Sequence, residues 1–267
     1  MAKLMIHDVR TELRISTIRN RVTITNLDSA KIAARCASER RLLEKAVDHF
    51  NSYFPPAEQI PQEVWKNAIT RPIGGNPKNR YQLTLAMIGE EIVGASSYFY
   101  LAGPSTLFCG YIRVVDEYQN SGIGTLLFSE MVAFATCAAE IAGKSLLSIS
   151  GEVERLDSVS SEQLADARKR LAIFITAGAG LLGHHTDFYY GQPLSGEKLT
   201  PLNIIFAPFE SKAQLSADEV GVLVTAIYSA IYNSLPDYQV ALLRVLRSIP
   251  KTGVPIATDF GLDINRI

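Results

Sequence analysis

Residues 111–134 read YIRVVDEYQNSGIGTLLFSEMVAF, and the rest of the chain is organised around this stretch. Its first five residues form a largely apolar, β-branched run that predicts a buried strand. A short polar segment, residues 116–121, follows the strand. Gly122 then opens an apolar-periodic helix, one face of which should pack on a sheet. The residues of that face, spaced by three and four, are Ile123, Leu127, Met131, Phe134, Ala138 and Ile141.

A helix start of this kind suits an anion. The first N–H groups of a helix have no intrahelical partner and carry the positive end of the helix dipole. Gly122 and Gly124 allow a tight bend and a close approach of the ligand to the backbone, and Thr125 adds a hydroxyl. The predicted ligand group is therefore a phosphate or a pyrophosphate.

Two common phosphate-binding motifs do not match the stretch. The dinucleotide fingerprint G-x-G-x-x-G requires a third glycine, and the P-loop requires Gly-Lys-Ser/Thr, and both are missing here. A nucleotide-binding α/β protein is therefore disfavoured, and a plain glycine turn between a core strand and a core helix is the alternative without a ligand.

The whole string from Val115 to Leu127 resembles the Q/R-x-x-G-x-G/A signature of the GNAT superfamily of acyl-CoA-dependent N-acyltransferases. This resemblance implies acetyl-CoA as co-substrate, with its pyrophosphate on the loop amides. It also implies that the strand before the loop is splayed from a parallel neighbour and that pantetheine lies in the gap. The cofactor-binding residues implied in this way are Val114, Val115, Gln119, Asn120, Ser121, Gly122, Ile123, Gly124 and Thr125.

Composition excludes several other classes. The 267 residues are 47% hydrophobic and 20% charged, which is typical of a globular chain. A net charge of −1 gives no reason to expect a nucleic-acid or membrane partner. Three cysteines at unrelated spacings indicate buried thiols and a reducing cytoplasm, and the chain opens without a signal peptide or a bilayer-spanning apolar run. The four histidines show no metal-ligand spacing, so no metal is expected.

The remaining patterns predict an α/β fold. With the resemblance, the expected architecture is a GNAT-type mixed, mostly antiparallel central sheet with a splayed parallel strand pair and helices on both faces. The predicted elements after the first 80 residues are a hairpin over 81–100, strands over 106–115 and 146–150, a helix over 161–177, and strands over 185–192 and 202–207 joined by residues 193–201.

Three segments are expected along the chain. Residues 1–21 are an N-terminal extension or a first strand, residues 22–209 the acyltransferase domain, and residues 210–267 a C-terminal helical extension. Ser216 and Glu219 form a capping box that starts the first helix of this extension. The extension should cover the sheet or form a dimer interface, and residues 250–267 read as a loop.

Acyl transfer from a thioester to an amine requires a proton acceptor for the amine and a proton for the leaving thiolate. Many GNAT proteins carry a tyrosine four residues before the glycine after the fourth helix, but here Phe174 stands at that position before Gly178. Phe174 cannot donate a proton, and it reads as a core aromatic.

Two other residues are the catalytic candidates. Tyr190 lies in a Tyr-Tyr-Gly-Gln-Pro string, which resembles the Tyr-x-Gln-Pro of some longer bacterial GNAT proteins. It would position the amine or act as the acid; packing on the sheet is the alternative. Glu152 and Glu154 follow the strand over 146–150, and Glu152 would accept the ammonium proton, directly or through water. A solvated surface pair is the alternative for these carboxylates.

We therefore expect an N-acetyltransferase that uses acetyl-CoA, acts on a small-molecule or peptide amine by direct attack in a ternary complex, and exists as a monomer or homodimer in the cytoplasm. The alternative is a non-catalytic acyl-CoA-binding sensor or scaffold module, which the Phe174 departure favours.

Overall fold

A computed structural model describes residues 21–27, 37–53, 75–183, 188, 190–195, 198–233, 235 and 237–258. The chain forms two compact units. Unit 1 comprises Lys3–Tyr100 and Cys109–Gly143, and unit 2 comprises Leu101–Phe108 and Lys144–Ile267. Strand β4 (Thr106–Val114) contributes its first three residues to unit 2 and the rest to unit 1.

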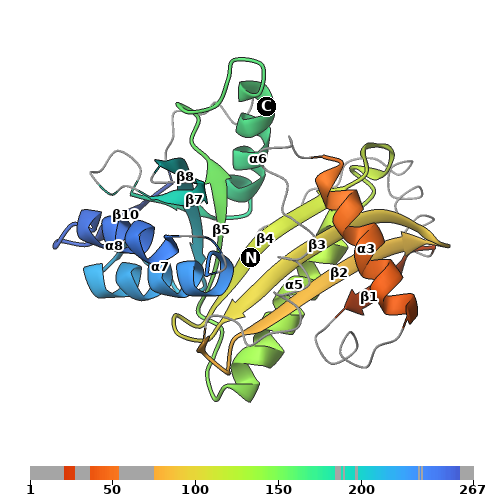
Figure 1. The fold of residues 1–267 in the computed structure, drawn as a ribbon, viewed down its shortest axis with the longest axis horizontal. Coiled ribbons are helices and arrows are strands. Elements are labelled where there is room, and N and C mark those ends of the chain that lie inside the picture. The colour runs from red at the N-terminus through yellow and green to blue at the C-terminus, as the bar shows by residue number, and fades with distance from the viewer. Residues whose placement is uncertain are drawn as a thin grey trace. The chain divides into compact units, whose positions relative to one another are not determined.

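The strands of unit 1 follow one another in the order β1-β2-β3-β4. They are β1 (Thr23–Leu27), β2 (Arg80–Ile88), β3 (Glu91–Leu101) and β4, with β1 and β3 antiparallel to β2. Helix α5 (Ile123–Ile141) lies on one face of these strands and helix α3 (Ala37–Asn51) on the other (Figure 1). The predicted hairpin and the predicted strand before the polar segment are both present. Residues 1–20, which belong to the segment predicted as an N-terminal extension or a first strand, lie outside the described residues.

The start of α5 packs into the core of unit 1. Ile123 and Leu127 are fully buried and cluster with Ala86 of β2 and Val93 of β3. The cluster forms because β3 carries Gly94 beside the helix, where an added Cβ would lie 3.0 Å from Cγ2 of Ile123. The helix start is thereby held against the sheet at van der Waals distance.

The buried face of α5 differs in part from the predicted one. Ile123, Leu127, Met131 and Ala138 are buried as predicted, but Ala135 takes the place expected for Phe134, which is half-buried and meets the Tyr98 ring at 5.3 Å. Ile141 is 72% exposed, so its assignment to the core was wrong. Ile141 lies in the last turn of α5, which is not part of the cluster formed by Ala86, Val93, Ile123 and Leu127.

Helix α5 is also long and apolar enough, by length and composition alone, to cross a membrane. A single core helix passes this test as well, and the inner face of α5 packs on β2 and β3.

The strands of unit 2 follow the order β4-β5-β8-β6-β10-β9, and β7 also pairs with β8. The unit's other strands are β5 (Ser148–Glu154), β6 (Gly180–Leu182), β7 (Gly191–Ser195), β8 (Lys198–Pro208), β9 (Gln214–Leu215) and β10 (Val254–Ala257). Its helices are α6 (Leu164–Thr176), α7 (Ala217–Ile231) and α8 (Tyr238–Ser248). With the parallel β4–β5 pair in a mostly antiparallel sheet, the predicted fold class is confirmed.

Several boundaries in unit 2 were predicted incorrectly. Strand β5 continues to Glu154 because it pairs along its length with β8, from Ser148↔Pro208 to Glu154↔Leu202. Most of the expected connection over residues 193–201 instead belongs to the β7–β8 hairpin. Residues 250–267 are not all loop, since β10 pairs with both β6 and β9. The pairing partners of these short segments lie far away in sequence, so local pattern could not reveal them.

The C-terminal helices pack within unit 2. The buried face of α7 comprises Val220, Leu223, Val224, Ile227, Tyr228 and Ala230. The predicted capping box is present, because the Ser216 hydroxyl accepts from Glu219 N and the Glu219 carboxylate accepts from Ser216 N at 2.9 Å. The domain boundaries at residues 21/22 and 209/210 stay a prediction.

We expect Gly94→Ala to destabilise the protein by about 1–3 kcal/mol, because overpacking forces neighbours to shift. The added methyl group would meet Arg113 O and Cδ1 of Leu127, each at 3.2 Å, as well as Ile123. Gly103→Ala is the control, since its nearest contact would be Val222 at 3.8 Å. Urea unfolding of the three proteins measures the difference. Equal unfolding midpoints for the Gly94 variant and the parent would contradict this account of the packing.

We also expect Glu219 to contribute an acid-sensitive part of the stability. The bond from the Lys212 ammonium and that from Ser216 N lower its pKa from 4.5 to about 2. A carboxyl group with a lowered pKa stabilises the folded state above pH 4.5, and this contribution is lost between about pH 4.5 and 2. Glu219→Gln keeps the cap but removes the charge, so its melting temperature should fall less over this range. Asp218→Asn is the matched charge control; an identical acid profile for Glu219→Gln and the parent would refute the assignment.

Candidate functional site

The predicted cofactor loop follows strand β4, and hydrogen bonds to strand β3 and within the loop hold its conformation. Val114 ends the strand, and Val115 N donates to Val93 O at 3.0 Å. A single 3-10 turn (Asp116–Tyr118) follows, and the Ser121 hydroxyl donates to Tyr118 O at 2.5 Å. The local bonds therefore hold the loop without any ligand.

The residue that connects the loop to α5 has a left-handed backbone conformation. Gly122 is the N-cap of α5, with φ 85°, and Asn120 before it has φ 60°. A side chain at Gly122 would strain this conformation, which explains why a glycine stands there. The turn reverses the chain between the strand end and the helix within the predicted residues.

The amides at this helix start are placed to receive an anion. The first intrahelical bond is Leu126 N to Gly122 O at 3.0 Å, so the N–H groups of Ile123, Gly124 and Thr125 precede the helical hydrogen-bond pattern. A Cβ added at Gly124 would have its nearest neighbour at 3.8 Å, on Val114. The backbone at Gly124 is thus open to close approach, as phosphate binding requires.

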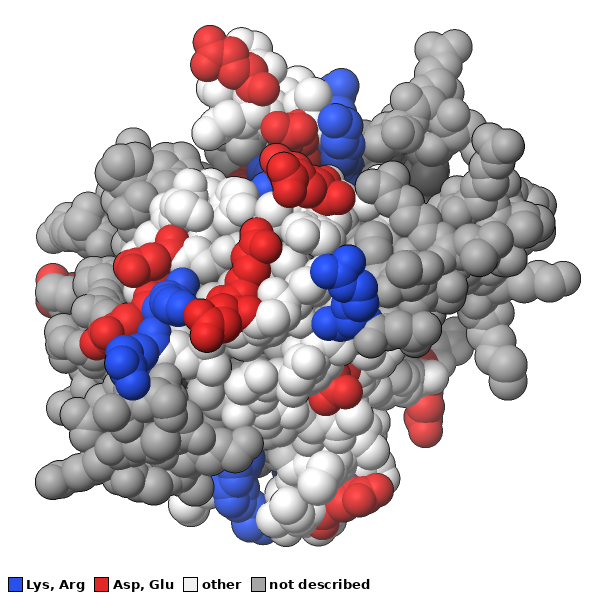
Figure 2. Space-filling model, turned by 90° about the vertical axis from the view of Figure 1, so that its right-hand side faces the viewer, with Lys and Arg blue, Asp and Glu red and all other residues white. Residues whose placement is uncertain are grey.

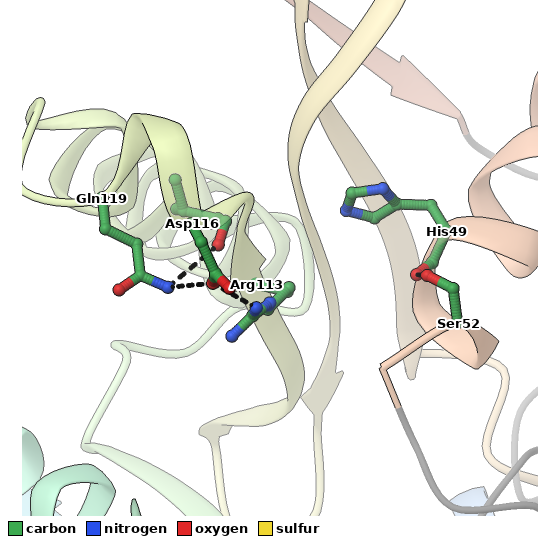
Figure 3. A network of polar contacts seen from close by, with 6 residues as sticks. His49, Ser52, Arg113, Asp116 and Gln119 are labelled. Carbon is green, nitrogen blue, oxygen red and sulfur yellow. Dashed lines mark hydrogen bonds and ion pairs between the residues drawn. The ribbon is translucent and has the colours of Figure 1, made fainter.

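The side chain of Gln119 belongs to a polar network with two residues that the sequence reasoning missed (Figure 3). Its Nε2 donates to Asp116 Oδ1 at 2.7 Å and to Val114 O at 3.4 Å. Asp116 also forms an ion pair with Arg113, with 2.5 Å between Nη2 and Oδ1. Arg113, Asp116 and Gln119 follow one another at steps of three residues, and this spacing could have indicated the network from the sequence. Gln119 stabilises the strand end and the loop in this structure.

A histidine from α3 lies near the same arginine. The Arg113 guanidinium stacks 4.0 Å above the Tyr53 ring, and the His49 ring meets Tyr53 edge-on at 5.3 Å. Burial, and then the charge of Arg113, lower the pKa of His49 below its usual 6.5, so the imidazole is neutral at pH 7. Figure 3 shows His49 in the last turn of α3 and Ser52 just after the helix, both apart from the network around Asp116.

In unit 2, the two predicted catalytic residues are in direct contact. Glu152 lies within β5 opposite Ile204 of β8, so it belongs to the strand and not to a loop after it. The Tyr190 hydroxyl donates to Glu152 Oε1. A third residue, which the sequence reasoning missed, completes the group, since the Tyr232 hydroxyl donates to Oε2 at 2.5 Å. The structure thus joins three segments that are far apart in the chain.

Burial and mutual hydrogen bonding shift the pKa values of Glu152 and Tyr190. Tyr190 and Tyr232 are buried, with 2% and 3% of their surface exposed, whereas Glu152 is only partly buried. Burial raises the pKa of Glu152, and the two tyrosine bonds act against that rise. The pKa of Tyr190 is raised well above 10, first by burial and then by the charge of Glu152. Tyr190 therefore remains protonated, with its proton directed at the carboxylate.

The other sequence candidates have structural surroundings. Glu154 forms an ion pair with Arg170 of α6 at 2.7 Å. Phe174 is half-buried and packs against the cluster of Val153, Leu171, Leu181 and Ile205, in agreement with its reading as a core aromatic. The histidines at positions 184 and 185 and the tyrosine at position 189 lie outside the described residues.

The cysteines that the structure describes differ from each other. Cys109 of β4 is buried, and burial raises its thiol pKa to about 12. Cys137 of α5 is exposed, so the expectation of a buried thiol was wrong there. In the described part of the chain, no group of three or more His, Cys, Asp or Glu side chains could hold a metal ion. Figure 2 shows acidic and basic side chains interspersed on one face of the molecule.

No protein-family model matches the chain, and no curated protein matches it. Solved structures do. A GNAT-family acetyltransferase from Bacteroides thetaiotaomicron is 16% identical, with 82% of this chain and 98% of that chain covered and a TM-score of 0.48. Arabidopsis thaliana Naa50, in complex with the bisubstrate analogue CoA-Ac-MVNAL, is 15% identical over 71% and 99% of the two chains, with a TM-score of 0.41.

The ribosomal-protein-S18-alanine N-acetyltransferase from Escherichia coli is 13% identical, with 72% of this chain and 96% of that chain covered and a TM-score of 0.39. Many of the solved structures that are similar to this chain are acetyltransferases of the GNAT family.

Proposed function

We propose that this protein is an N-acyltransferase of the GNAT type, which moves an acetyl group from acetyl-CoA to a primary amine. The single observation that carries the proposal is the start of α5. A left-handed Gly122 follows a strand end there, and the amides of residues 123–125 precede the first intrahelical bond. Together with the Gln119–Gly124 signature, this geometry supports a site for the coenzyme A pyrophosphate.

The chain's own groups account for the binding of the donor. The pyrophosphate would accept hydrogen bonds from the amides of Ile123, Gly124 and Thr125, and the positive end of the α5 dipole favours its charge. The Thr125 hydroxyl is a further donor. The Asp116 network holds the loop in shape, so little ordering entropy is lost when the ligand binds.

The proposed reaction is direct attack of the neutral amine on the thioester carbonyl carbon. A C–N bond forms, the C–S bond breaks, and the thiolate leaves with the coenzyme. The proton lost by the amine goes to the Glu152 carboxylate, directly or through one water, and a proton from solvent or a nearby acid restores the thiol. The raised pKa of Tyr190 favours orientation of Glu152 and the acceptor over protonation of the thiolate.

The alternative function is an acyl-CoA-binding sensor or scaffold without catalysis. The observation that favours it is Phe174, which stands in the core where many GNAT proteins carry an acid tyrosine. Release of free thiol from acetyl-CoA with a panel of small-molecule and peptide amines separates the two functions. Binding of coenzyme A without thiol release for any amine would support the module.

We further propose a cytoplasmic location. Cys137 is a free, exposed cysteine, and such a thiol suits a reducing compartment.

The cofactor site can be tested at Gly124. We expect Gly124→Val to raise the dissociation constant for coenzyme A at least tenfold, about 1.4 kcal/mol, because the side chain blocks approach to the amides. Gly124→Ala, whose methyl group fits at 3.8 Å from Val114, is the folding control and should weaken binding less. Calorimetric titration measures the affinity. Unchanged affinity in a folded Gly124→Val protein would reject the site, and a thermal shift with ATP or NAD instead of acetyl-CoA would indicate a nucleotide-binding protein.

Direct attack also makes a prediction about Cys109. With a thiol pKa of about 12, almost no thiolate is present at pH 8, so acetyl-CoA alone should leave no acetyl group on Cys109. Intact-mass and peptide mass spectrometry measure this. Cys109→Ala should retain turnover, and the exposed Cys137 serves as the internal control for thiol reactivity. An acetyl adduct on Cys109 that transfers to an added amine would establish a covalent intermediate instead.

A further inference from the structure

The C-terminal extension supplies a hydrogen bond to the predicted base. Tyr232 is the C-terminal cap residue of α7, where its N–H donates to Tyr228 O at 3.0 Å. Its hydroxyl reaches across to β5 and donates to Glu152 Oε2 at 2.5 Å. The two residues are separated by 80 positions in the chain, so only the packing of α7 in unit 2 brings them together.

The tyrosines around Glu152 form a packed row that leaves Tyr232 little freedom. The Tyr228 ring meets Tyr232 edge-on at 5.3 Å and meets Tyr190 edge-on at 6.0 Å. Tyr228 and Tyr232 are four residues apart and therefore share one face of α7. The Tyr228 hydroxyl is directed elsewhere, because it donates to Gly191 O. Two of the three tyrosine hydroxyls, those of Tyr190 and Tyr232, thus donate to Glu152, and the third donates to the backbone of β7.

The two hydroxyl groups that reach Glu152 occupy different oxygens. Tyr190 binds Oε1 and Tyr232 binds Oε2, so rotation of the carboxylate would break one bond or the other. Glu152 itself is partly exposed while both tyrosines are buried. The two buried tyrosines therefore fix the carboxylate at both of its oxygens.

We propose that Tyr232 is a positioning residue, which together with Tyr190 fixes the Glu152 carboxylate, so that helix α7 completes the base of the site. This inference rests on the proposed function for its catalytic meaning. It assigns the C-terminal extension a part in the reaction beyond covering the sheet. A chain that lacked α7 would retain Glu152 but lose one of the two donors that orient it.

The proton affinity of Glu152 provides a readout that a merely structural role would not change. Among the described residues, the titratable groups that face this carboxylate are Tyr190 and Tyr232, with Tyr228 behind them. The neighbouring charge on β5, Glu154, is paired with Arg170. Because both tyrosine hydroxyls stabilise the ionised form, removal of one raises the pKa of the carboxyl group.

The test compares two Tyr→Phe changes on the same helix. Tyr232→Phe removes a donor to Glu152, whereas Tyr228→Phe removes the hydroxyl of another buried tyrosine, which donates to Gly191 O. The Glu152 pKa is measured by NMR titration of ¹³C-carboxyl-labelled glutamate, with Glu152→Gln to assign the resonance. We expect Tyr232→Phe to raise this pKa by about one pH unit, since bonds to charged groups are the stronger ones, and Tyr228→Phe to change it little.

The kinetic arm uses the same proteins with acetyl-CoA and the best amine acceptor. The acid limb of the rate–pH profile should move to higher pH in Tyr232→Phe and stay in place in Tyr228→Phe. If no amine is acetylated by the parent, the proposed function fails, while the titration still decides whether Tyr232 governs Glu152. An unchanged pKa in folded Tyr232→Phe, or equal shifts in both variants, would overturn the inference.

A second variant covers the case in which Tyr232→Phe does not fold. Site-specific replacement of Tyr232 by 3-fluorotyrosine keeps the ring and its hydroxyl, but makes that hydroxyl a more acidic and stronger donor. The Glu152 pKa should then fall below that of the parent protein. A value that is unchanged or higher would contradict a direct bond between Tyr232 and the carboxylate.

Discussion

The contact between the start of helix α5 and strand β3 is the constraint on which the proposed cofactor site depends. Gly94 allows Ile123 to approach the strand closely, and Ile123 is the first residue of α5. Apolar burial therefore fixes the position of the amides that precede the helical bonds. The proposed site for the acetyl-CoA donor thus depends on core packing. Ile123 packs against the sheet, and the amides proposed to bind the ligand are its own and those of the next two residues.

The polar groups next to this contact stabilise the turn rather than extend the ligand site. Asp116 accepts from both Arg113 and Gln119, so the strand end and the loop are tied together by side chains. In unit 2 a carboxylate is held differently, by two phenols and by no cation among the described residues. A carboxylate without a cationic partner retains a higher proton affinity, which is the property that a proton acceptor needs near neutral pH.

Much of the fold could be predicted because local pattern and tertiary structure agree there. The strand, turn and helix over residues 111–134 follow from hydrophobic period and glycine placement, and the Ser216–Glu219 capping box follows from spacing alone. The predictions were wrong where strands are short and their partners distant, as with β10, or where a strand gains length from its neighbour, as β5 does from β8. Pairing partners decide such boundaries, and the sequence of one strand does not contain them.

The resemblance to GNAT proteins supplied the expected sheet arrangement and pointed to Tyr190. The sequence by itself determined the α/β class, the position of the strand, turn and helix that carry the proposed cofactor site, and Glu152 as an ionisable candidate. These depend on period, glycine conformation and residue chemistry, which are local properties. Only the tertiary structure decided that Tyr190 and Tyr232 both form hydrogen bonds with Glu152. It also decided that Glu154 forms an ion pair with Arg170. Contacts between β5, the segment before β7 and the end of α7 arise from the packing of elements far apart in the chain, and side-chain partners across such distances are set by that packing alone.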